Sequence, residues 1–443
     1  MNNVRATVIE LLGQLGSSRE ARQYLKQFSK VEQTRFAVVK VGGAVLRDDI
    51  DALAAALAFL HQLGLTPIVL HGAGPQLDEA MAEAGLSVEK HDGLRVTTEA
   101  VMEVVRPIIY EANTQLIDAL EARGVKARGV LHGVFKSHLA NPDQLGLVGE
   151  VDQVELNPLS AAIRAGALPV LACLGESPSG QMMNINADIA AQELVWAVKP
   201  HKVIFLTETG GLLGPDGGIV SAINLRADFD RLMDSQWVHS GMALKLKTIA
   251  TMLDQLPSET SVSITSASKL TRELFTHTGA GTLIRRGELI EWHSRLNDER
   301  LGRIQSLFET SFQRRLHDDW LADRSVLGWL VAETDRAAAL ICEGVDGVAY
   351  LDKIVVTPEA QGEGLGAALW SSLRERFDAM YWRSRVHNPV NGWYFQQAQM
   401  SARGAEWVVF AIGVDSGERF DRWVNDAQHR HSGWVSTDGV GDD

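Results

Sequence analysis

Four short apolar runs, each followed within three residues by glycine, constrain the fold of the first two thirds of the chain. The runs occupy residues 36–41, 66–70, 167–172 and 202–207. Alanine-rich stretches with helical spacing separate them, so strands and helices alternate along the chain. Strands without polar alternation are buried on both faces, as in a parallel sheet covered by helices. Residues 35–286 are therefore predicted to form an α/β domain, a three-layer αβα sandwich with a mainly parallel sheet.

The composition of the sequence and the order of its predicted elements change after residue 286. Most of the 11 tryptophans lie in the last third of the chain. There the patterns predict helices over 299–315 and 364–377, with strands over 325–343, 347–356 and 380–385. Residues 287–443 are thus predicted to form a separate α+β domain with a mixed sheet. An N-terminal segment, residues 1–34, is predicted to be helical over 4–28 and to serve oligomerisation or regulation.

Composition excludes several classes of protein. Lysine and arginine total 42 against 56 aspartates and glutamates, a net charge of −14, so a broadly basic nucleic-acid surface is excluded. Cys173 and Cys342 are the only cysteines, which excludes a disulfide scaffold and a four-cysteine zinc site. No apolar run reaches the roughly 20 residues that span a bilayer. We expect a cytoplasmic protein without a resident metal site or a membrane partner.

Two glycine loops follow neighbouring predicted strands. Lys40 precedes Gly42 and Gly43, and the second loop contains Gly72 and Gly74. A lysine and bare backbone N–H groups at strand ends can hold phosphates. Ordinary turns would use the same glycines, and neither loop has the spacing of a P-loop or a dinucleotide-binding fingerprint. Because the two loops occur together, they indicate a site for two anionic groups.

Four further polar residues follow these loops in the chain. Arg95 could clamp a carboxylate or form a surface ion pair. Asn184 and Asp188 open a helix, where Asn186 or Asp188 could act as a plain N-cap. Lys245 stands at a helix start, where the helix dipole disfavours a cation, so an anionic partner or full solvation is expected.

The segments that carry these residues resemble the amino-acid kinase family, and most closely the N-acetyl-L-glutamate kinases. The matching segments are KVGG at 40–43, HGAGP at 71–75, GLRVT at 93–97, NINAD at 184–188 and GMALK at 241–245. The resemblance implies that Lys40 and Lys245 stabilise the phosphoryl group in transfer and that Asp188 holds both lysines.

The same resemblance assigns the binding residues. Backbone N–H groups of Gly43, Gly72 and Gly74 would contact the anions, while Arg95 and Asn184 would hold a carboxylate of N-acetyl-L-glutamate. ATP with Mg²⁺ would be the phosphoryl donor, and the nucleotide-binding positions implied are Gly42, Gly43, Thr207, Gly210 and Gly211. Ala73 departs from the family, which usually has glycine there, and its methyl group is expected to crowd one contact and affect turnover.

A second glycine-rich turn lies in the C-terminal domain. The apolar strand residues Ile354, Val355 and Val356 lead into a turn containing Gln361, Gly362, Gly364 and Gly366, and a helix follows. Helix N-terminal amides after such a turn can hold a pyrophosphate, although a bare turn before a helix looks the same. The spacing resembles the acetyl-CoA signature of the N-acetyltransferase superfamily.

Aromatic and basic residues cluster over 381–395. Trp382, Trp393 and Phe395 are expected in the core, whereas the phenol of Tyr394 can protonate a departing thiolate. This region resembles vertebrate-like N-acetylglutamate synthases. The resemblance implies Tyr394 as general acid, Lys353 and Arg385 as ligands of the glutamate carboxylates, and Asn388 or Asn391 in the substrate pocket. No residue stands out as the base, and a water relay is expected.

Together the two resemblances imply an enzyme that acetylates L-glutamate with acetyl-CoA and phosphorylates N-acetyl-L-glutamate with ATP. In the principal alternative, the kinase-like domain is a silent module that binds L-arginine and regulates the synthase. Retention of Lys40, Asp188 and Lys245 favours an active kinase. A weaker alternative is an acetyltransferase acting on a protein amine. L-arginine is the expected effector, through the N-terminal helix and residues 274–284, and a homotetramer is the expected assembly.

Overall fold

The computed structural model describes residues 35–91, 93–238, 240–257, 260–275, 280–358, 360 and 364–435. The predicted helix over residues 4–28 lies outside this range, as do Gln361, Gly362 and residues 276–279 of the predicted arginine loop. The chain divides into two compact units, with the boundary between Arg286 and Gly287. Each unit is described by itself.

The first unit is built on an eight-stranded sheet with the order β12-β14-β13-β11-β1-β2-β8-β5. The four apolar runs form its adjacent strands β11, β1, β2 and β8, and all neighbours from β13 to β5 pair in parallel. Only β14 pairs antiparallel to β13, and β12 follows β14. The strands are β1 (Ala37–Val41), β2 (Ile68–His71), β5 (Ala127–Val130), β8 (Leu168–Ala172), β11 (Lys202–Leu206), β12 (Ala222–Asn224), β13 (Ser261–Thr265) and β14 (Thr282–Arg285).

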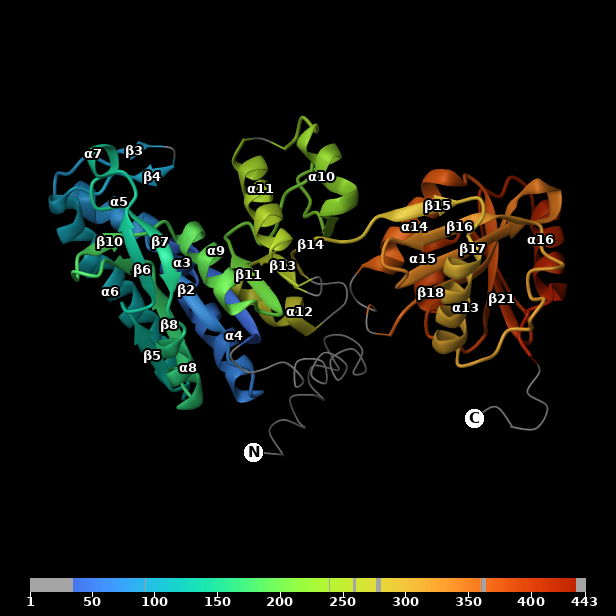
Figure 1. Cartoon of the computed structure of the whole chain (residues 1–443), viewed down its shortest axis with the longest axis horizontal. Helices are drawn as coiled ribbons and strands as arrows, with labels where there is room; N and C mark the ends of the chain where they lie inside the picture. The colour runs from blue at the N-terminus through green and yellow to red at the C-terminus, as the bar shows by residue number, and fades with distance from the viewer. Residues whose placement is uncertain are drawn as a thin grey trace. The chain divides into compact units, whose positions relative to one another are not determined.

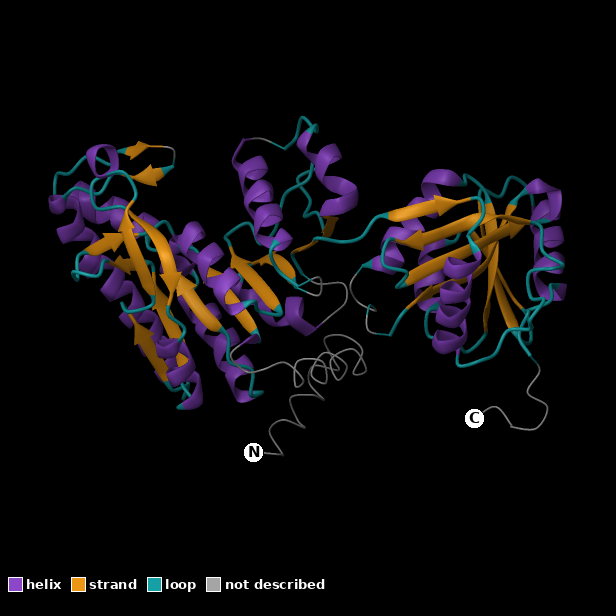
Figure 2. Ribbon diagram, in the orientation of Figure 1, coloured by secondary structure: helices purple, strands orange, loops and turns teal. Residues whose placement is uncertain are grey.

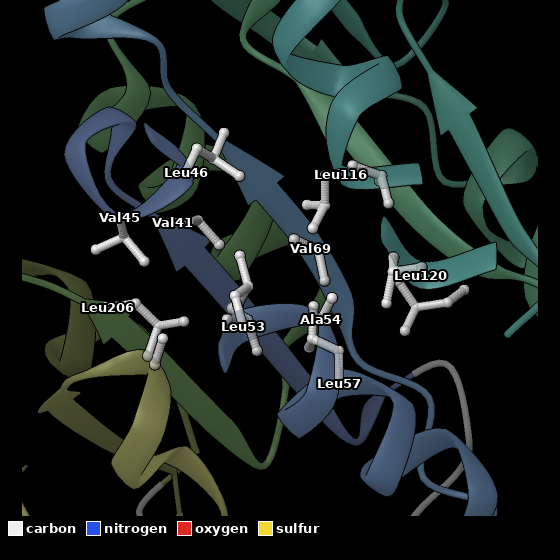
Figure 3. Close-up of a cluster of buried hydrophobic side chains, with 14 of the residues drawn as sticks. Val41, Val45, Leu46, Leu53, Ala54, Leu57, Val69, Leu116, Leu120 and Leu206 are labelled. Carbon is white, nitrogen blue, oxygen red and sulfur yellow. The ribbon is translucent and has the colours of Figure 1, made fainter. Parts of the chain in front are cut away.

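Helices cover both faces of this sheet (Figures 1 and 2). One face carries α3 (Gly43–Asp48), α4 (Ile50–Gln62), α5 (Gly74–Glu83), α6 (Glu99–Glu121), η2 (Ala267–Lys269) and α12 (Leu270–Phe275). The other carries α8 (Asn157–Arg164), α9 (Ala187–Val198), α10 (Leu225–Met233) and α11 (Ser240–Asp254). Figure 3 shows the first of these cores, where Val41, Val69 and Leu206 of three strands meet leucines of the covering helices. The predicted αβα sandwich is confirmed.

Two smaller sheets extend this unit. One has the order β10-β9-β6-β7, and the other pairs β3 with β4. Their strands are β3 (Lys90–His91), β4 (Leu94–Arg95), β6 (Phe135–Leu139), β7 (Gly149–Val154), β9 (Leu174–Glu176) and β10 (Met182–Asn184), with the short helix α7 (Pro142–Leu145) between β6 and β7. Strand β9 begins two residues after the end of β8, so this sheet continues from the carboxyl edge of the main sheet.

The second unit is built on a seven-stranded mixed sheet with the order β15-β16-β17-β18-β19-β21-β20. Only β18 and β19 pair in parallel, and their pairing covers Ala349–Leu351 and Met380–Trp382 alone. Beyond these residues both strands continue without pairing to each other, so the sheet opens between them. The strands are β15 (Ile290–His293), β16 (Val326–Ala332), β17 (Ala337–Glu343), β18 (Ala349–Val356), β19 (Met380–Arg385), β20 (Met400–Arg403) and β21 (Trp407–Ile412).

Two helices cover each face of the second sheet. Helices α13 (Asp298–Phe312) and α16 (Gly417–His429) lie on one face, and α13 crosses in front of the strands in Figure 1. Helices α14 (Leu365–Arg376) and α15 (Asn391–Gln397) lie on the other, and the short η3 (Val345–Gly347) precedes β18. No helix within the described ranges is long and apolar enough to cross a membrane.

The prediction that Phe395 belongs to the core is wrong. Trp382 is fully buried and Trp393 is half-buried, as expected, but Phe395 is 51% exposed. Successive residues on a helix point about 100° apart, so α15 turns Phe395 outward when it turns Tyr394 toward the sheet.

Candidate active sites

The two glycine loops of the first unit meet at the carboxyl ends of β1 and β2. A Cβ atom on Gly43 would lie 2.7 Å from the backbone nitrogen of Gly74, so only glycine permits this approach. The Gln76 side chain donates to the carbonyl of Gly43 at 2.8 Å and ties the loops together. Helices α3 and α5 start at Gly43 and Gly74, and neither has a side-chain cap. Their first N–H groups therefore remain available to an anion.

Lys40, Asp188 and Lys245 come together beside these loops. Lys40 Nζ lies 2.7 Å from Asp188 Oδ1. Burial lowers the pKa of Lys245, the carboxylate of Asp188 raises it, and the charge of Lys40 lowers it. The Asp188 carboxylate, in direct contact with Lys40, thus also attracts the ammonium group of Lys245, which offsets the repulsion between the two lysines while leaving net positive charge.

The start of α9 explains how Asp188 is free to contact Lys40. Asn186 caps this helix and accepts from the N–H groups of Asp188 at 2.8 Å and Ile189 at 3.3 Å. Asn186 is therefore the N-cap, one of the two residues considered from the sequence. With the cap supplied by its neighbour, the Asp188 carboxylate is left for the lysines.

Lys40 and Asn186 border a cavity of about 270 Å³. Its wall includes both glycine loops, Lys40, Arg95 and Asn184. Arg95 forms an ion pair with Asp78 and contacts Met81, so its guanidinium is fixed in place. Asn184 donates to Thr97 Oγ1 at 3.1 Å. The structure thus brings together all predicted residues of the acceptor site.

Ala73 lies at the boundary between the cavity and the core. Its side chain is buried and belongs to the hydrophobic cluster under α3 to α6, although the residue borders the cavity. Cys173 also borders the cavity and donates to the carbonyl of His71 at 3.0 Å. Burial raises the pKa of this thiol to about 12, so it stays protonated and unreactive.

Sequence reasoning missed Lys90 in this cavity. Lys90 lies directly across the β3–β4 pair from Arg95, and both border the same space. The signal was present, because a turn-forming Asp-Gly pair separates the two short segments and a hairpin would align the two cations.

The predicted nucleotide-binding residues Thr207, Gly210 and Gly211 do not border this cavity. They follow β11, which neighbours β1 in the sheet, with Leu206 opposite Val41. Gly210 adopts φ +68°, and its N–H donates to Thr207 Oγ1 at 3.2 Å. This turn therefore follows the strand next to the one that carries Lys40, which pairs with Phe205 of β11.

A second cavity, of about 240 Å³, opens where β18 and β19 separate. Residues of both strands border it, and so do residues from α15, β21 and the chain after α16. They include five predicted site residues: Lys353, Ile354, Arg385, Asn388 and Tyr394.

Tyr394 is the buried phenol of this cavity. Its ring packs against Trp382 and Phe410, with centroids 5.6 and 5.4 Å away. Burial raises the pKa of Tyr394 to about 12, so the hydroxyl keeps its proton at neutral pH. A protonated phenol that borders the cavity between the separating strands β18 and β19 can act as a proton donor.

Lys353 is held within a buried ionic cluster. Its Nζ donates to Asp352 Oδ1 at 2.5 Å, and Asp352 Oδ2 accepts from Arg324 Nε at 3.1 Å. Burial lowers the pKa of Lys353, while Asp352 raises it. Arg385 is half-exposed; it pairs with Glu406 at 2.9 Å and lies over the ring of Trp407.

The sequence left open whether Asn388 or Asn391 lies in the substrate pocket, and the structure distinguishes them. Asn388 borders the cavity. Asn391 is buried, and its amide donates to the carbonyls of Arg385 at 2.8 Å and Val386 at 3.1 Å. Asn391 therefore fixes the turn after β19 rather than bordering the pocket. Sequence reasoning also missed Arg383, Ser432 and Trp434, which border the cavity.

The glycine-rich turn leads into α14 as predicted. Gly364 adopts φ +87° at the N-cap, a conformation that favours glycine, and no side chain caps the helix. A Cβ on Gly366 would lie 3.6 Å from Val356, so the helix start approaches the end of β18. Val355 is buried on the opposite face, with the α13 and α16 core.

Within the described residues, no group of three or more His, Cys, Asp or Glu side chains is arranged to hold a metal ion. Cations dominate both cavities instead, and such sites suit anionic substrates.

The fold and the sites define a two-domain class, a small-molecule kinase domain followed by an acyltransferase domain. Two family models match accordingly: the amino acid kinase family over residues 35–266, and the N-acetyltransferase of N-acetylglutamate synthase over residues 290–430. The chain belongs to the amino acid kinase family, in the group whose kinase domain is fused to this N-acetyltransferase domain.

Relatives extend over nearly the whole chain. "Acetylglutamate kinase" of Xylella fastidiosa strain 9a5c is 46% identical over 416 residues, which cover 94% of this chain and 99% of that protein. Human mitochondrial N-acetylglutamate synthase is 32% identical over 428 residues, covering 93% of this chain and 76% of that protein.

A solved structure shares the fold. N-acetylglutamate synthase from Neisseria gonorrhoeae, complexed with coenzyme A and N-acetyl-glutamate, aligns with a TM-score of 0.63 at 19% identity. The alignment covers 89% of this chain and 98% of that one. The predicted fold class, the fusion of the two domains and the kinase and N-acetyltransferase classes are confirmed. The domains and the relatives' names place the chain in arginine biosynthesis.

Proposed function

We propose that the first unit transfers the γ-phosphoryl group of ATP to the side-chain carboxylate of N-acetyl-L-glutamate. We propose further that the second unit transfers the acetyl group of acetyl-CoA to the amine of L-glutamate. The product of the second reaction is the acceptor of the first, so one chain would carry two consecutive steps.

The grouping of Lys40, Asp188 and Lys245 beside two uncapped helix starts carries the kinase proposal. Phosphoryl transfer needs positioning and charge stabilisation more than a covalent nucleophile. The 2.7 Å contact between Lys40 and Asp188 leaves the lysine fixed, and the same carboxylate raises the pKa of Lys245 against the effect of burial. Two fixed cations and the N–H groups of Gly43 and Gly74 would stabilise the charge on the phosphoryl oxygens in transfer.

The remaining substrate groups have candidate ligands nearby. Arg95 and Asn184 border the cavity and would hold the acceptor's α-carboxylate, with Gly72 beneath it. The turn at Thr207, Gly210 and Gly211, with Gly42, would hold the nucleotide. Mg²⁺ would arrive bound to ATP.

In the second unit, the opening between β18 and β19 would admit acetyl-CoA. The N–H groups at the start of α14, including Gly366, would hold its pyrophosphate, beside Ile354, Val355 and Val356. Gln361 and Gly362 stay predictions from the sequence. Tyr394 would protonate the departing thiolate, while Lys353, Arg385 and Asn388 would bind glutamate. Asn391 would support them through the turn after β19.

The alternative, a silent kinase-like module, requires none of this arrangement. A module that only binds an effector has no need for two lysines paired through one carboxylate. L-arginine as an effector, the homotetramer and the cytoplasmic location stay predictions from the sequence.

The test compares ADP release from ATP and N-acetyl-L-glutamate with Mg²⁺ in the intact protein and two lysine variants. Lys245→Ala removes the partly buried cation. Lys247→Ala is the matched control, because Lys247 is exposed two residues further along the same helix. Acetyl transfer to glutamate is followed in the same preparations.

We expect Lys245→Ala to abolish ADP release and leave acetylation intact, with Lys247→Ala unchanged in both. No ADP release from the intact protein, together with robust acetylation, would refute the kinase proposal and support the regulatory alternative. No acetylation of glutamate by the intact protein would refute the synthase proposal.

A further inference from the structure

Four residues after α16 close one side of the second cavity. We call residues 431–434 the C-terminal strap. The match to the N-acetyltransferase family ends at residue 430, yet Ser432 and Trp434 border the cavity together with the strand residues. A part of the cavity wall therefore comes from chain beyond the family match.

The strap is tied to the segment before β16. Arg324 Nη2 donates to the carbonyl of His431 at 2.9 Å, and the N–H of His317 donates to the carbonyl of Gly433 at 3.0 Å. Trp434 forms an isolated antiparallel bridge with Leu316. Gly433 adopts φ +78°, and a Cβ there would lie 2.9 Å from Arg324 Nη2, so this close approach needs glycine. The strap is therefore an ordered part of the cavity wall, held by hydrogen bonds to the segment before β16.

The strap also encloses the ammonium group of Lys353. Lys353 Nζ donates to the carbonyl of Ser432 at 2.9 Å and to Asp352 at 2.5 Å. The ring centroid of Trp434 lies 5.3 Å from Nζ, and that of Trp320 lies 5.7 Å away. A cation within about 6 Å of an aromatic ring is attracted to the ring face.

The same ring holds a second basic residue near the cavity. Trp434 packs against Phe312 with centroids 5.2 Å apart, and the guanidinium of Arg314 lies 5.9 Å from the indole centroid. Phe312 and Arg314 also border the cavity. The Trp434 ring thus lies within about 6 Å of two cations that border the cavity.

We infer that Trp434 and the Ser432 carbonyl are positioning elements that hold Lys353 where it meets a carboxylate of the amino-acid acceptor. This inference rests on the proposed acetyltransferase function. The strap would thus raise the affinity for the acceptor, and it would take no part in the chemical step at Tyr394. None of the contacts given above for the strap involves α14, whose start is the proposed site of the acetyl-CoA pyrophosphate, so the inference predicts an unchanged affinity for acetyl-CoA.

The test uses the full chain and three variants. Trp434→Leu keeps an apolar side chain of moderate size but removes the aromatic face, whereas Trp434→Phe keeps an aromatic face. Val435→Ala is the matched control, because Val435 follows the strap and does not border the cavity. Initial rates of acetylation give kcat and separate KM values for glutamate and acetyl-CoA, and circular dichroism against the intact chain reports that the second unit is folded.

We expect Trp434→Leu to raise KM for glutamate about 5- to 25-fold, the range of one desolvated cation–π contact. The value of kcat and KM for acetyl-CoA should stay within about twofold. Trp434→Phe should recover most of the glutamate affinity, and Val435→Ala should behave as the intact chain.

An unchanged KM for glutamate in Trp434→Leu, or equal changes in both KM values, would overturn the inference while leaving the acetyltransferase proposal in place. A loss of kcat alone would overturn it too, since it would place the strap in the chemical step. An intact chain that does not acetylate glutamate would overturn the proposed function, and the inference with it.

Discussion

Replacing Asp188 by asparagine tests whether one carboxylate organises both lysines of the kinase site. The Lys40–Asp188 contact of 2.7 Å corresponds to a Coulomb attraction of about 6 kcal/mol at an effective dielectric constant of about 20, before desolvation. Asp188 is 54% exposed, so solvent screening leaves only a part of this in net stability. The larger effect falls on catalysis, because the amide cannot hold two ammonium groups together.

We expect Asp188→Asn to lower kcat for ADP release by about 10²- to 10³-fold, the loss typical of one preorganised electrostatic contact. The pH dependence should change as well. Asp188 raises the pKa of Lys245, whereas burial and Lys40 lower it. Without the carboxylate the pKa of Lys245 falls further, so the lysine loses its proton at lower pH. The alkaline limb of the rate profile should therefore move to lower pH.

The assay is ADP release at saturating substrates, measured from about pH 6 to pH 10. Asp51→Asn is the matched control, since Asp51 is an exposed carboxylate paired with Arg123 at 2.8 Å, away from the cavity. It should reproduce the intact profile. An alkaline limb that stays in place in Asp188→Asn would refute the electrostatic coupling, and an unchanged kcat would remove Asp188 from the kinase site.

One further prediction concerns each unit. Gly43→Ala should lower kcat/KM for ADP release by at least about tenfold, because the new Cβ meets the Gly74 backbone; an unchanged kcat/KM would contradict the loop geometry. Tyr394→Phe should lower acetylation by about 10²-fold or more with ADP release unchanged. Because the pKa of Tyr394 is raised to about 12, acetylation should show no loss from phenol ionisation up to about pH 10; an alkaline loss that Tyr394→Phe removes would contradict this.

The strands of the main sheet could be predicted because a strand that is buried on both faces consists of consecutive apolar residues. The four apolar runs are adjacent strands of the main sheet, and the glycine turns follow three of them at the carboxyl edge. The antiparallel pairing of β14 with β13 could not be predicted, because the residue pattern of a short apolar strand does not indicate whether it pairs parallel or antiparallel.

The site residues that the sequence revealed are those in compact segments, such as Lys40 with its glycines. Residues whose position depends on distant contacts were missed. Trp434 meets Lys353 only because the chain returns to β18 after α16, and the contacts that place it come from residues about 80 and 110 positions away. The sequence also did not distinguish Asn388 from Asn391, since only the turn geometry directs one amide to the backbone and the other to the cavity.

Both cavities are lined by cations although the chain carries a net charge of −14. The proposed substrates, ATP, acetyl-CoA, glutamate and its acetylated form, are all anions, so the overall field repels them and only the local field attracts them. Exposed charges are screened beyond about 10 Å at 0.1 M salt, whereas partly buried cations such as Lys245 and Lys353 are screened much less. Moderate salt should therefore weaken the long-range repulsion more than the attraction within the cavities. In each unit, one carboxylate, Asp188 or Asp352, keeps neighbouring cations together without cancelling their charge. The same arrangement thus serves two different reactions, because both need anions held firmly in a protein that is otherwise acidic.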